Sequence, residues 1–412
     1  MLDGYPSAKK RLVKKNPKKQ SQIAKEWDAS LMATGFIPRW HIVMVTGCNL
    51  RCTYCATEHG RFGQAKEGVM SLKTANVLAE RIVQCVAPSE ASVVLEFGGG
   101  ETFLHFDRFI KIHDLIVRAC RTKGVQVSFH VTTNGVLLNE DRLQKLAKRR
   151  INLSFSIDGP EAVHDVNRRS ALDQSTFKTA FGNWQRYRLL TQTTQSSHLS
   201  SVHSVFTMNS GTLQDICNYW AGQGIPLAEI APANVSRFST SAQRKEAKCV
   251  LRQFMKGLRE TAMEQAETCS AMTFLSDYRG PQSIFMGWSR LLQGREKHFC
   301  TPAQGILAVG HGGDIYPCEA YIGMPQWRLG DLLNGIDVGK VSEFSESYAQ
   351  ARAHCEGCQH RQVCDKPCFA IVATDTPLQN VKQRCKMAKQ DARIIEASFK
   401  KLMRSKGRGK RE

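Results

Sequence analysis

The chain has 412 residues, 42% of them hydrophobic, with a formal net charge of +20 and 15 cysteines. This length and apolar content predict two or three domains with a sizeable core, and they exclude a wholly disordered chain. Secretion and membrane insertion are not expected, because no apolar run approaches the roughly 18 residues of a membrane span. In a cytoplasmic chain, so many cysteines point to metal or cluster ligation rather than to disulfides.

Both ends of the chain are basic. Residues 9–19 and residues 400–411 each contain seven Lys or Arg and no acid, and the body between them is mildly basic. Such runs are usually solvated tails, although a positive charge also favours an anionic partner. Our hypothesis is that the first run helps to attract an acidic peptide.

From about residue 40 to residue 234, short β-branched runs alternate with amphipathic segments such as 71–86 and 105–120, which predicts parallel βαβ units. We expect six strands, at residues 41–46, 92–97, 125–132, 151–156, 201–206 and 227–230. Six units favour an α/β fold with a partial (β/α)6 barrel over a doubly wound open sheet. In both folds the active-site residues lie beyond the C-terminal ends of the strands.

The composition changes after the predicted barrel. Residues 236–299 have a helical, linking pattern, and residues 300–390 are rich in Cys, Gly and Pro, which predicts a small domain held together by metal. A last helix is expected at about 381–403. The predicted organisation is a basic segment (1–38), a barrel (39–235), a helical linker (236–299), a cysteine-rich domain (300–390), and a helix end with a basic tail (391–412).

A first cysteine cluster follows the first predicted strand. The sequence TGCNLRCTYC places Cys48, Cys52 and Cys55 in a C-x3-C-x2-C pattern. Three thiolates can hold three corners of a cubane iron-sulfur cluster and leave the fourth iron open to a substrate or cofactor. The alternative is a structural zinc site completed by His59.

This motif resembles the signature of the radical S-adenosylmethionine (SAM) enzymes. Their open iron binds SAM, and the reduced cluster cleaves it to a 5′-deoxyadenosyl radical. The segments FGGGETFL, TTNG and SFSIDGPEAVHDVNR follow the second, third and fourth predicted strands and resemble further SAM-binding segments of that family. Each string alone is weak, but their joint order, each at a strand end, is specific.

The resemblance implies particular SAM contacts. Gly99, Gly100 and Glu101 would meet the SAM amino group, because glycines allow close approach and a carboxylate pairs with an ammonium group. The family's usual Pro is replaced by Thr102. Asn134 would meet the ribose hydroxyls.

Further SAM contacts come from the fourth segment and from the cysteine motif. By the same resemblance, Ser156 and Arg168 would hold the SAM carboxylate, and Asp158 would shape the ribose or turn region. Tyr54, inside the cysteine motif, is also expected to contact SAM.

A second cysteine array lies in residues 300–385, with the pattern C-x12-G-x4-C, C-x2-C-x5-C-x3-C and a final C. It resembles the SPASM domain, which holds two auxiliary 4Fe-4S clusters in radical SAM enzymes that modify peptides and proteins. The resemblance implies one auxiliary cluster on Cys300, Cys318 and Cys368, and another on Cys355, Cys358, Cys364 and Cys385. With the SAM-binding cluster, three 4Fe-4S clusters are expected.

The array departs from some family members, which have an eighth cysteine just before the position of Cys300. The first auxiliary cluster would therefore have an open iron or take another ligand, with His298 as the nearest candidate. A zinc ribbon is the alternative for the C-x2-C part.

The other five cysteines fall in helical segments without ligand spacing and are expected to be buried small hydrophobic residues: Cys85, Cys120, Cys217, Cys249 and Cys269.

The resemblance also implies a peptide or protein substrate. We expect a precursor-peptide maturase that installs a C–C, ether or thioether cross-link; the alternative is an anaerobic sulfatase-maturating enzyme, which converts Cys or Ser to formylglycine. Glu319 follows Cys318 where the sulfatase enzymes place an Asp base, so it is a candidate catalytic base; a merely solvated carboxylate is the other interpretation. Because this position is Glu and the first cluster is followed by a maturase-like segment, the precursor-peptide reading is preferred.

The expected partners are a ribosomally made precursor peptide and a reductant such as flavodoxin or ferredoxin, and the expected state is a monomer. A basic, zinc-stapled nucleic-acid-binding protein is the alternative from another class, and it would show steeply salt-dependent binding. Nucleic-acid binding is not favoured, because the sequence has no aromatic RNA-binding strand, recognition helix or zinc-finger spacing.

Overall fold

The computed structural model describes residues 37–86, 92–192, 200–233, 239–294, 302–364 and 377–404. The central feature is a run of six parallel strands that lie side by side in chain order. They are β1 (Arg39–Val43), β4 (Ser92–Phe97), β5 (Gln126–Thr133), β6 (Asn152–Ser156), β7 (Ser201–Phe206) and β8 (Leu227–Pro232). A doubly wound sheet would reverse its strand order at a switch point. The observed order therefore confirms the partial barrel and the predicted strands.

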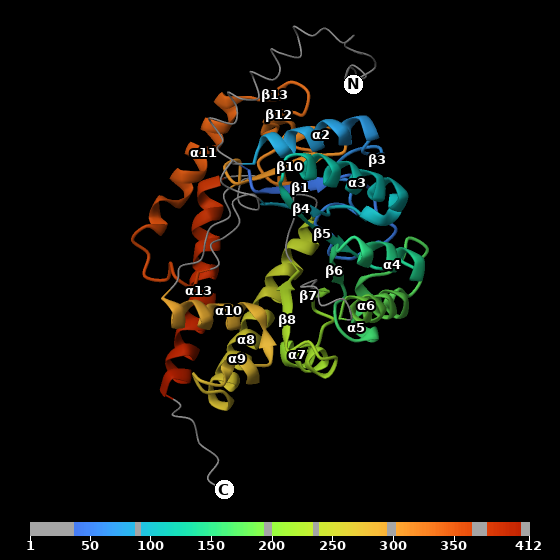
Figure 1. Ribbon diagram of the computed structural model, residues 1–412. Helices are drawn as coiled ribbons and strands as arrows, with labels where there is room; N and C mark the ends of the chain where they lie inside the picture. Colours follow the sequence, from blue (N-terminus) through green and yellow to red (C-terminus); the bar gives the residue numbers. More distant parts are fainter. Residues whose placement is uncertain are drawn as a thin grey trace.

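The helices lie on both sides of this arc of strands (Figure 1). Those of the barrel are α2 (Leu72–Gln84), α3 (Phe106–Thr122), α4 (Glu140–Lys148), α5 (Glu161–Asn167), α6 (Phe177–Gln192) and α7 (Leu213–Gly222). Beyond the barrel come α8 (Ser241–Thr268), α9 (Phe274–Asp277), α10 (Gln282–Gln293), α11 (Val338–Arg352) and α13 (Pro377–Arg404). In Figure 1, α2, α3, α4 and α6 lie on one side of the strands, and α8 and α13 lie on the other.

Alternation within the strands separates a buried face from a concave polar face. In β4, Val93, Leu95 and Phe97 are buried, whereas Val94 and Glu96 are half-buried. Because successive side chains of a strand point to opposite faces, the buried set packs under the helices, and the less buried set, which includes Glu96, lines the inside of the half barrel. The side chains of this concave face can therefore contact a ligand.

The cysteine-rich region joins the barrel sheet, which the sequence did not predict. Strand β10 (Ile306–Gly310) pairs in parallel with β1, and β11 (Asp314–Tyr316), β12 (Gly330–Asp331) and β13 (Gly335–Ile336) follow in antiparallel order. At the other edge β9 (Gly280–Pro281) pairs with β8. Strands β2 (Val45–Thr46) and β3 (Gly68–Val69) form a separate ribbon. The described residues also include short 3₁₀ helices: η1 (Thr102–His105), η2 (Glu319–Tyr321), η3 (Pro325–Trp327) and η4 (Ala353–Cys355).

Four of the five cysteines without ligand spacing are buried as expected, but the prediction for Cys249 is wrong. Cys249 is half-buried, and its sulfur lies 3.3 Å from a guanidinium nitrogen of Arg252. Helix α8 buries the stripe formed by Val250, Phe254 and Leu258. Position 249 is one residue away from this stripe, which rotates its side chain by about 100° from the core.

Several sequence expectations lie outside the described residues: the basic run 9–19, most of the run 400–411, Cys300, Cys368 and His298. Within the described ranges, no helix combines the length and the apolar character needed to cross a membrane.

Candidate active site at the ends of the parallel strands

The loop between β2 and β3 carries the first three cysteines, all half-buried free thiols. The backbone N–H of Leu50 points at Cys48 Sγ over 3.4 Å, and the N–H of His59 points at Cys55 Sγ over 3.1 Å. Burial raises the pKa of Cys48 to about 12 and that of Cys52 to about 11. A bound cationic centre would hold these groups as thiolates at neutral pH, so the donor set suits a metal cluster.

Two polar side chains from later strand ends reach this loop. Arg168 places Nη1 3.9 Å from Cys52 Sγ, and Asn134 places Nδ2 3.8 Å from Cys48 Sγ. The same Asn134 amide donates to Asn49 Oδ1 over 2.8 Å. The predicted SAM-contacting residues Asn134 and Arg168 thus lie directly beside the predicted cluster ligands.

The zinc alternative would use His59 as a fourth ligand beside the three cysteines. In the described part of the chain, no group of three or more His, Cys, Asp or Glu residues is arranged to hold a single metal ion. His59 belongs to the cysteine loop, and burial and nearby arginines lower its pKa, which favours the neutral imidazole that a metal ion binds.

Glycines let the cysteine loop pack against the end of β4. The Glu101 N–H donates to the Gly47 carbonyl over 2.9 Å, and a Cβ on Gly100 would lie only 2.4 Å from that carbonyl oxygen. Gly99 has φ +95°, and a Cβ there would meet Phe62 at 2.7 Å. These two glycines are therefore required for the contact between loop and strand end, whatever they also do with SAM.

Glu101 connects the ends of β4 and β5 from a buried position. Its carboxylate accepts hydrogen bonds from the Phe103 N–H (3.1 Å), the Thr133 hydroxyl (2.9 Å) and the Asn134 N–H (2.8 Å). Burial raises the pKa of Glu101, although the three hydrogen bonds oppose this shift. The carboxyl group is therefore held rigidly beside the loop.

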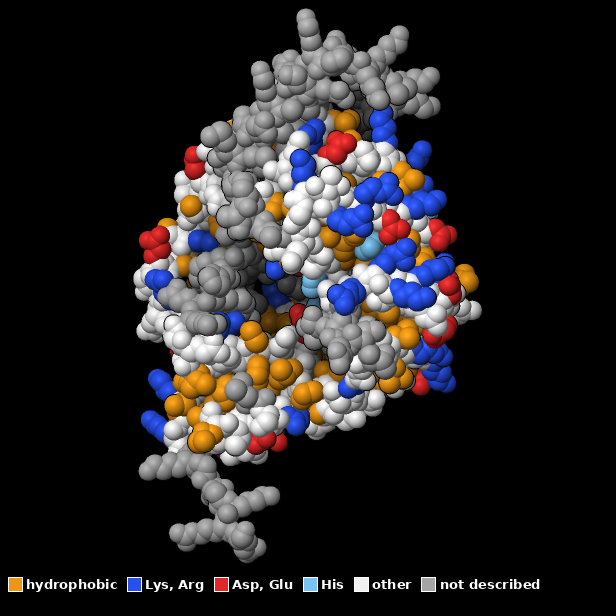
Figure 2. All heavy atoms as spheres, in the orientation of Figure 1, with side chains coloured by type: hydrophobic (Ala, Val, Ile, Leu, Met, Phe, Trp, Pro, Cys, Tyr) orange, Lys and Arg blue, Asp and Glu red, His pale blue; other side chains and the backbone are white. Residues whose placement is uncertain are grey.

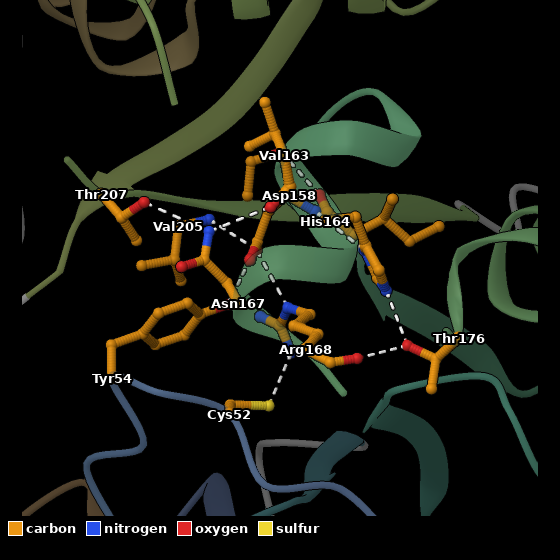
Figure 3. Close-up of polar contacts among 12 residues, drawn as sticks. Cys52, Tyr54, Asp158, Val163, His164, Asn167, Arg168, Thr176, Val205 and Thr207 are labelled. Carbon is orange, nitrogen blue, oxygen red and sulfur yellow. Dashed lines mark hydrogen bonds and ion pairs between the residues drawn. The ribbon is translucent and has the colours of Figure 1, made fainter. Parts of the chain in front are cut away.

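Asp158 is the centre of a second buried network, between β6 and α5 (Figure 3). Its Oδ1 accepts from Arg168 Nε (2.9 Å) and from the Val205 N–H (3.1 Å), and its Oδ2 accepts from the Tyr54 hydroxyl (2.5 Å). Burial acts to lower the pKa of Arg168, but the charge of Asp158 outweighs it and the pKa is raised. Protein groups thus engage both oxygens of Asp158, and its role in shaping the ribose or turn region stays a prediction.

A histidine that the sequence reasoning missed supports this network. His164 Nδ1 lies 3.4 Å from the Asp158 N–H, and its Nε2 lies 3.1 Å from the Thr176 hydroxyl. The Thr176 hydroxyl in turn donates to the Arg168 carbonyl. Burial lowers the pKa of His164 to about 4, so the imidazole is neutral at pH 7. His164 belongs to the HDVNR string, which could have pointed to it.

A cavity of about 560 Å³ opens beside the cysteine loop. It is lined by Cys52, Tyr54 and Cys55 of the loop, by Asn167, by Thr207 and Asn209 after β7, and by the start of α8. This volume lies within the usual range for small-molecule sites. The sequence reasoning missed Thr207 and Asn209, although their place just after a predicted strand could have singled them out.

Residues 42–186 match the model of the radical SAM superfamily. This chain contains a radical SAM domain. Two cysteine-type anaerobic sulfatase-maturating enzymes of Clostridium perfringens are similar to the chain. The strain 13 enzyme is 21% identical, over 84% of this chain and 89% of its own length. The strain ATCC 13124 enzyme is 22% identical, over 85% and 89%.

Solved structures show the same fold. The radical SAM protein matches anSMEcpe with bound AdoMet with a TM-score of 0.68 at 18% identity, over 87% of this chain and 99% of that one. It matches anSMEcpe with bound AdoMet and Cp18Cys peptide with a TM-score of 0.68 at 19% identity, over 88% and 99%. Streptococcus suis SuiB gives a TM-score of 0.54 at 14% identity, over 89% and 81%. The predicted family and fold class are therefore confirmed.

The concave face of the radical SAM protein carries paired histidines and carboxylates. His41 on β1 lies 2.5 Å from Glu96 on β4, and His203 on β7 lies 3.1 Å from Glu229 on β8. In register, His203 is opposite Ser156, the half-buried last residue of β6. Figure 2 shows a hollow near the middle of one face, with histidine and acidic side chains at its edge.

The structure brings Glu319 to this face. Its carboxylate lies 3.8 Å from His41 Nδ1, and its side chain is 52% exposed. Burial acts to lower the pKa of His41, but the contact with Glu96 and the charge of Glu319 raise it overall. The carboxylate that follows Cys318 is thus next to the inner surface of the half barrel, where a substrate would meet it.

Five of the seven cysteines in the second array are described. Cys318, Cys355, Cys358 and Cys385 are half-buried, Cys364 is buried, and all five are free of disulfides. Cys355 and Cys358 share a tight turn, in which the Cys358 N–H donates to the Cys355 carbonyl over 3.2 Å. The assignment of these thiols to auxiliary clusters stays a prediction.

Proposed function

We propose that this radical SAM protein oxidises a side chain of a peptide or protein substrate, with SAM and a 4Fe-4S cluster on Cys48, Cys52 and Cys55. The observation that carries the proposal is the cysteine loop itself, which lies against Asn134 and Arg168 at the ends of the parallel strands. When bound, the reduced cluster and SAM supply a 5′-deoxyadenosyl radical. The protein positions the groups and excludes water.

The chain's own residues would hold SAM through charge and hydrogen bonds. Arg168 uses Nε for Asp158 and points Nη1 at Cys52, so its planar fork still offers Nη2 to the SAM carboxylate. The Ser156 hydroxyl would add a second donor, and the rigid carboxyl group of Glu101 would face the SAM ammonium group. The cavity beside Tyr54 has the volume and the polar lining for the nucleoside part.

The concave polar face would hold the substrate. A peptide backbone offers N–H and C=O groups along its length, and the pairs His41–Glu96 and His203–Glu229 place polar side chains on this face. A similar fold has been solved with a bound Cp18Cys peptide, which supports a peptide as the class of substrate. Glu319 would accept the proton that a substrate group releases during oxidation.

We favour precursor-peptide cross-linking as the specific reaction. The base candidate is Glu319 rather than the Asp of sulfatase-maturating enzymes, and the segment after Cys55 resembles that of peptide maturases. The seven C-terminal cysteines would hold two auxiliary clusters that take up the surplus electron. Formation of formylglycine is the second candidate, because the similar sulfatase-maturating enzymes match 84–85% of the chain.

Formation of 5′-deoxyadenosine tests the radical SAM chemistry without a known substrate. Anaerobically purified protein with SAM and dithionite should form it, and the triple substitution of Cys48, Cys52 and Cys55 to Ala should abolish it. Cys249→Ala is the matched control, because this half-buried thiol has no ligand spacing and its loss should leave the rate unchanged. Continued formation by clean triple-alanine protein would disprove the proposal.

The substrate class can be tested by co-expression with a short peptide, or a sulfatase, encoded beside the gene. A cross-link lowers the peptide mass by a pair of hydrogen atoms and creates no aldehyde. Formylglycine instead reacts with a hydrazide probe. A product that reacts with the hydrazide would show that the protein forms formylglycine rather than a cross-link.

A further inference from the structure

The C-terminal cysteine region contains a buried histidine with no role in the site above. His360 lies between Cys358 and Cys364 and is 3% exposed. Its carbonyl accepts the N–H groups of Val363 (3.2 Å) and Cys364 (2.9 Å). The position of His360 therefore determines the turn that presents Cys364.

Both ring nitrogens of His360 have partners. Nδ1 lies 2.9 and 3.0 Å from the two carboxylate oxygens of Glu396, and Nε2 lies 3.2 Å from the amide nitrogen of Gln359. A carboxylate only accepts and an amide nitrogen only donates, so Nδ1 carries the proton and Nε2 accepts. The contacts thus fix the orientation of the ring.

Glu396 connects this turn to the helix that carries the last cysteine. Glu396 and Cys385 are both on α13, eleven residues apart, which is about three helical turns and brings them within roughly 20° of each other around the axis. Ala388 and Ala392, which are buried, lie on the same side between them. The contact to His360 therefore sets which face of α13 is turned toward the cysteine loop.

We propose that His360 and Glu396 form a clamp that assembles one cluster-binding set from two parts of the chain. One part is the loop with Cys355, Cys358 and Cys364, and the other is the α13 face with Cys385. His360 is a positioning residue and not a ligand, because both of its ring nitrogens are engaged. The inference rests on the auxiliary cluster of the proposed function and adds the residues that bring its ligands together.

The test compares Glu396 variants after anaerobic reconstitution with iron and sulfide. Glu396→Leu removes the acceptor and should lose up to about four irons per chain, the content of one cluster. A chelator should remove any remaining iron roughly 10-fold faster or more, because residues that orient metal ligands typically contribute at least that factor to metal affinity. The EPR signal of one reduced auxiliary cluster should weaken in parallel. His360→Leu should give the same result, and the double variant should add little.

Two further variants separate the clamp from a general effect on α13. Glu396→Gln keeps an acceptor for the His360 Nδ1–H and should restore most of the iron. Glu267→Leu removes another carboxylate contact of α13, the ion pair between Glu267 of α8 and Lys401 of α13, and should leave the iron content unchanged. A lower melting temperature of E396L with full iron and an unchanged EPR signal would overturn the proposal.

Cys385→Ala supplies the reference for loss of the cluster. If C385A keeps all its iron, the ligand set is wrong and the clamp with it. The SAM-binding cluster is untouched in every one of these variants, so 5′-deoxyadenosine formation should persist in all of them. Its absence from the wild-type protein would contradict the proposed function, whereas the iron measurement does not depend on that reaction.

Discussion

Asp158, a predicted SAM-contacting residue, forms a buried ion pair with Arg168. Its side chain is fully buried, and it neutralises Arg168, whose side chain is 10% exposed. The Tyr54 hydroxyl and the Val205 N–H complete its coordination. A buried charge that loses its partner is strongly destabilising, so Asp158 should matter for folding as well as for SAM.

Asp158→Asn should lower the free energy of unfolding by about 3 kcal/mol, because Arg168 then lies buried without a counter-charge. Tyr54→Phe removes one hydrogen bond to the same carboxylate and should cost about 1–2 kcal/mol. Asp141→Asn is the control: its contact with Lys145 is exposed and should contribute less than about 0.5 kcal/mol. Denaturant unfolding of the three variants measures this order, and equal effects of D158N and D141N would contradict it.

His164 makes stability depend on pH in mild acid. Its pKa is about 4 in the folded protein, against the ordinary value of 6.5 in the unfolded chain. The unfolded chain therefore takes up the proton first as the pH falls below 6.5, and the stability that neutral His164 contributes is lost by about pH 4. The total loss is of the order of 3 kcal/mol.

His164→Gln removes this titration and should flatten the decline in stability between pH 6.5 and about 4. At neutral pH the variant should be less stable than wild type, because its hydrogen bonds to Thr176 and Asp158 are weakened. His105→Gln, at an exposed histidine, should keep the wild-type slope. Parallel slopes for all three proteins in urea titrations would show that His164 is not the responsible group.

At the scale of elements, the cysteine loop depends on backbone packing that no larger residue tolerates. Gly100→Ala would push a Cβ to 2.4 Å from the Gly47 carbonyl and 2.8 Å from the Val45 carbonyl. Overpacking of this kind costs about 1–3 kcal/mol, and it should also displace the loop. We expect G100A to melt lower and to bind less iron at the first cluster.

Gly222→Ala provides the comparison for this glycine. Gly222 ends α7, and a Cβ there would meet no heavy atom within 4 Å. Ala has the higher helix propensity, so G222A should be neutral or stabilising. A G100A protein with the melting temperature and iron content of G222A would show that the loop adjusts to the added methyl group.

Local sequence patterns could predict the six strands of the barrel, but not that β10 pairs with β1. Residues 92–97 and 201–206 coincide with β4 and β7, because β-branched alternation and burial agree there. The segment of β10, ILAVG, is buried at every position and shows no alternation. Its pairing with β1 joins residues more than 260 positions apart along the chain, for example Arg39 and Ile306, and no local signal specifies it.

For the candidate site, the sequence could predict which residues lie near one another but not all of their contacts. Motif residues such as Asn134 and Arg168 lie beside the cysteines because strand ends of a parallel sheet meet at one edge. The sequence could not predict that the Asp158 carboxylate accepts hydrogen bonds from protein groups, since one of them, the Val205 N–H, comes from another strand. Nor could it predict that His41 stands between Glu96 and Glu319, which come from distant segments.

Across the whole molecule, the positive charge is not confined to the two ends of the chain. Figure 2 shows Lys and Arg gathered over the side of α3 and α4. The exposed residues there include Lys111, Arg118, Arg121, Lys123, Lys148 and Arg150. Most of them lie in or just beyond the last turn of a helix, where cations complement the helix dipole. Stabilisation of the helix ends thus explains why many of these cations are there, without a nucleic-acid partner.

The continuity of the sheet predicts how the whole protein unfolds. Strand β1 is hydrogen-bonded to β4 on one side and to β10 on the other, and Trp40 and Ile42 in it are fully buried. Separation of the C-terminal region would leave a central strand with an open edge and an uncovered apolar face. The barrel and the C-terminal hairpins should therefore open together, as one cooperative unit.

Hydrogen exchange on the cluster-loaded protein measures this directly. Amides of β1 and β10 should show the same high protection, and denaturant should lower it in both strands with the same slope. Amides near the ends of the exposed helix α4 provide the internal comparison and should exchange earlier. If β10 loses protection at lower denaturant than β1, the C-terminal region opens independently, and the parallel pairing of β10 with β1 does not join the two regions into one folding unit.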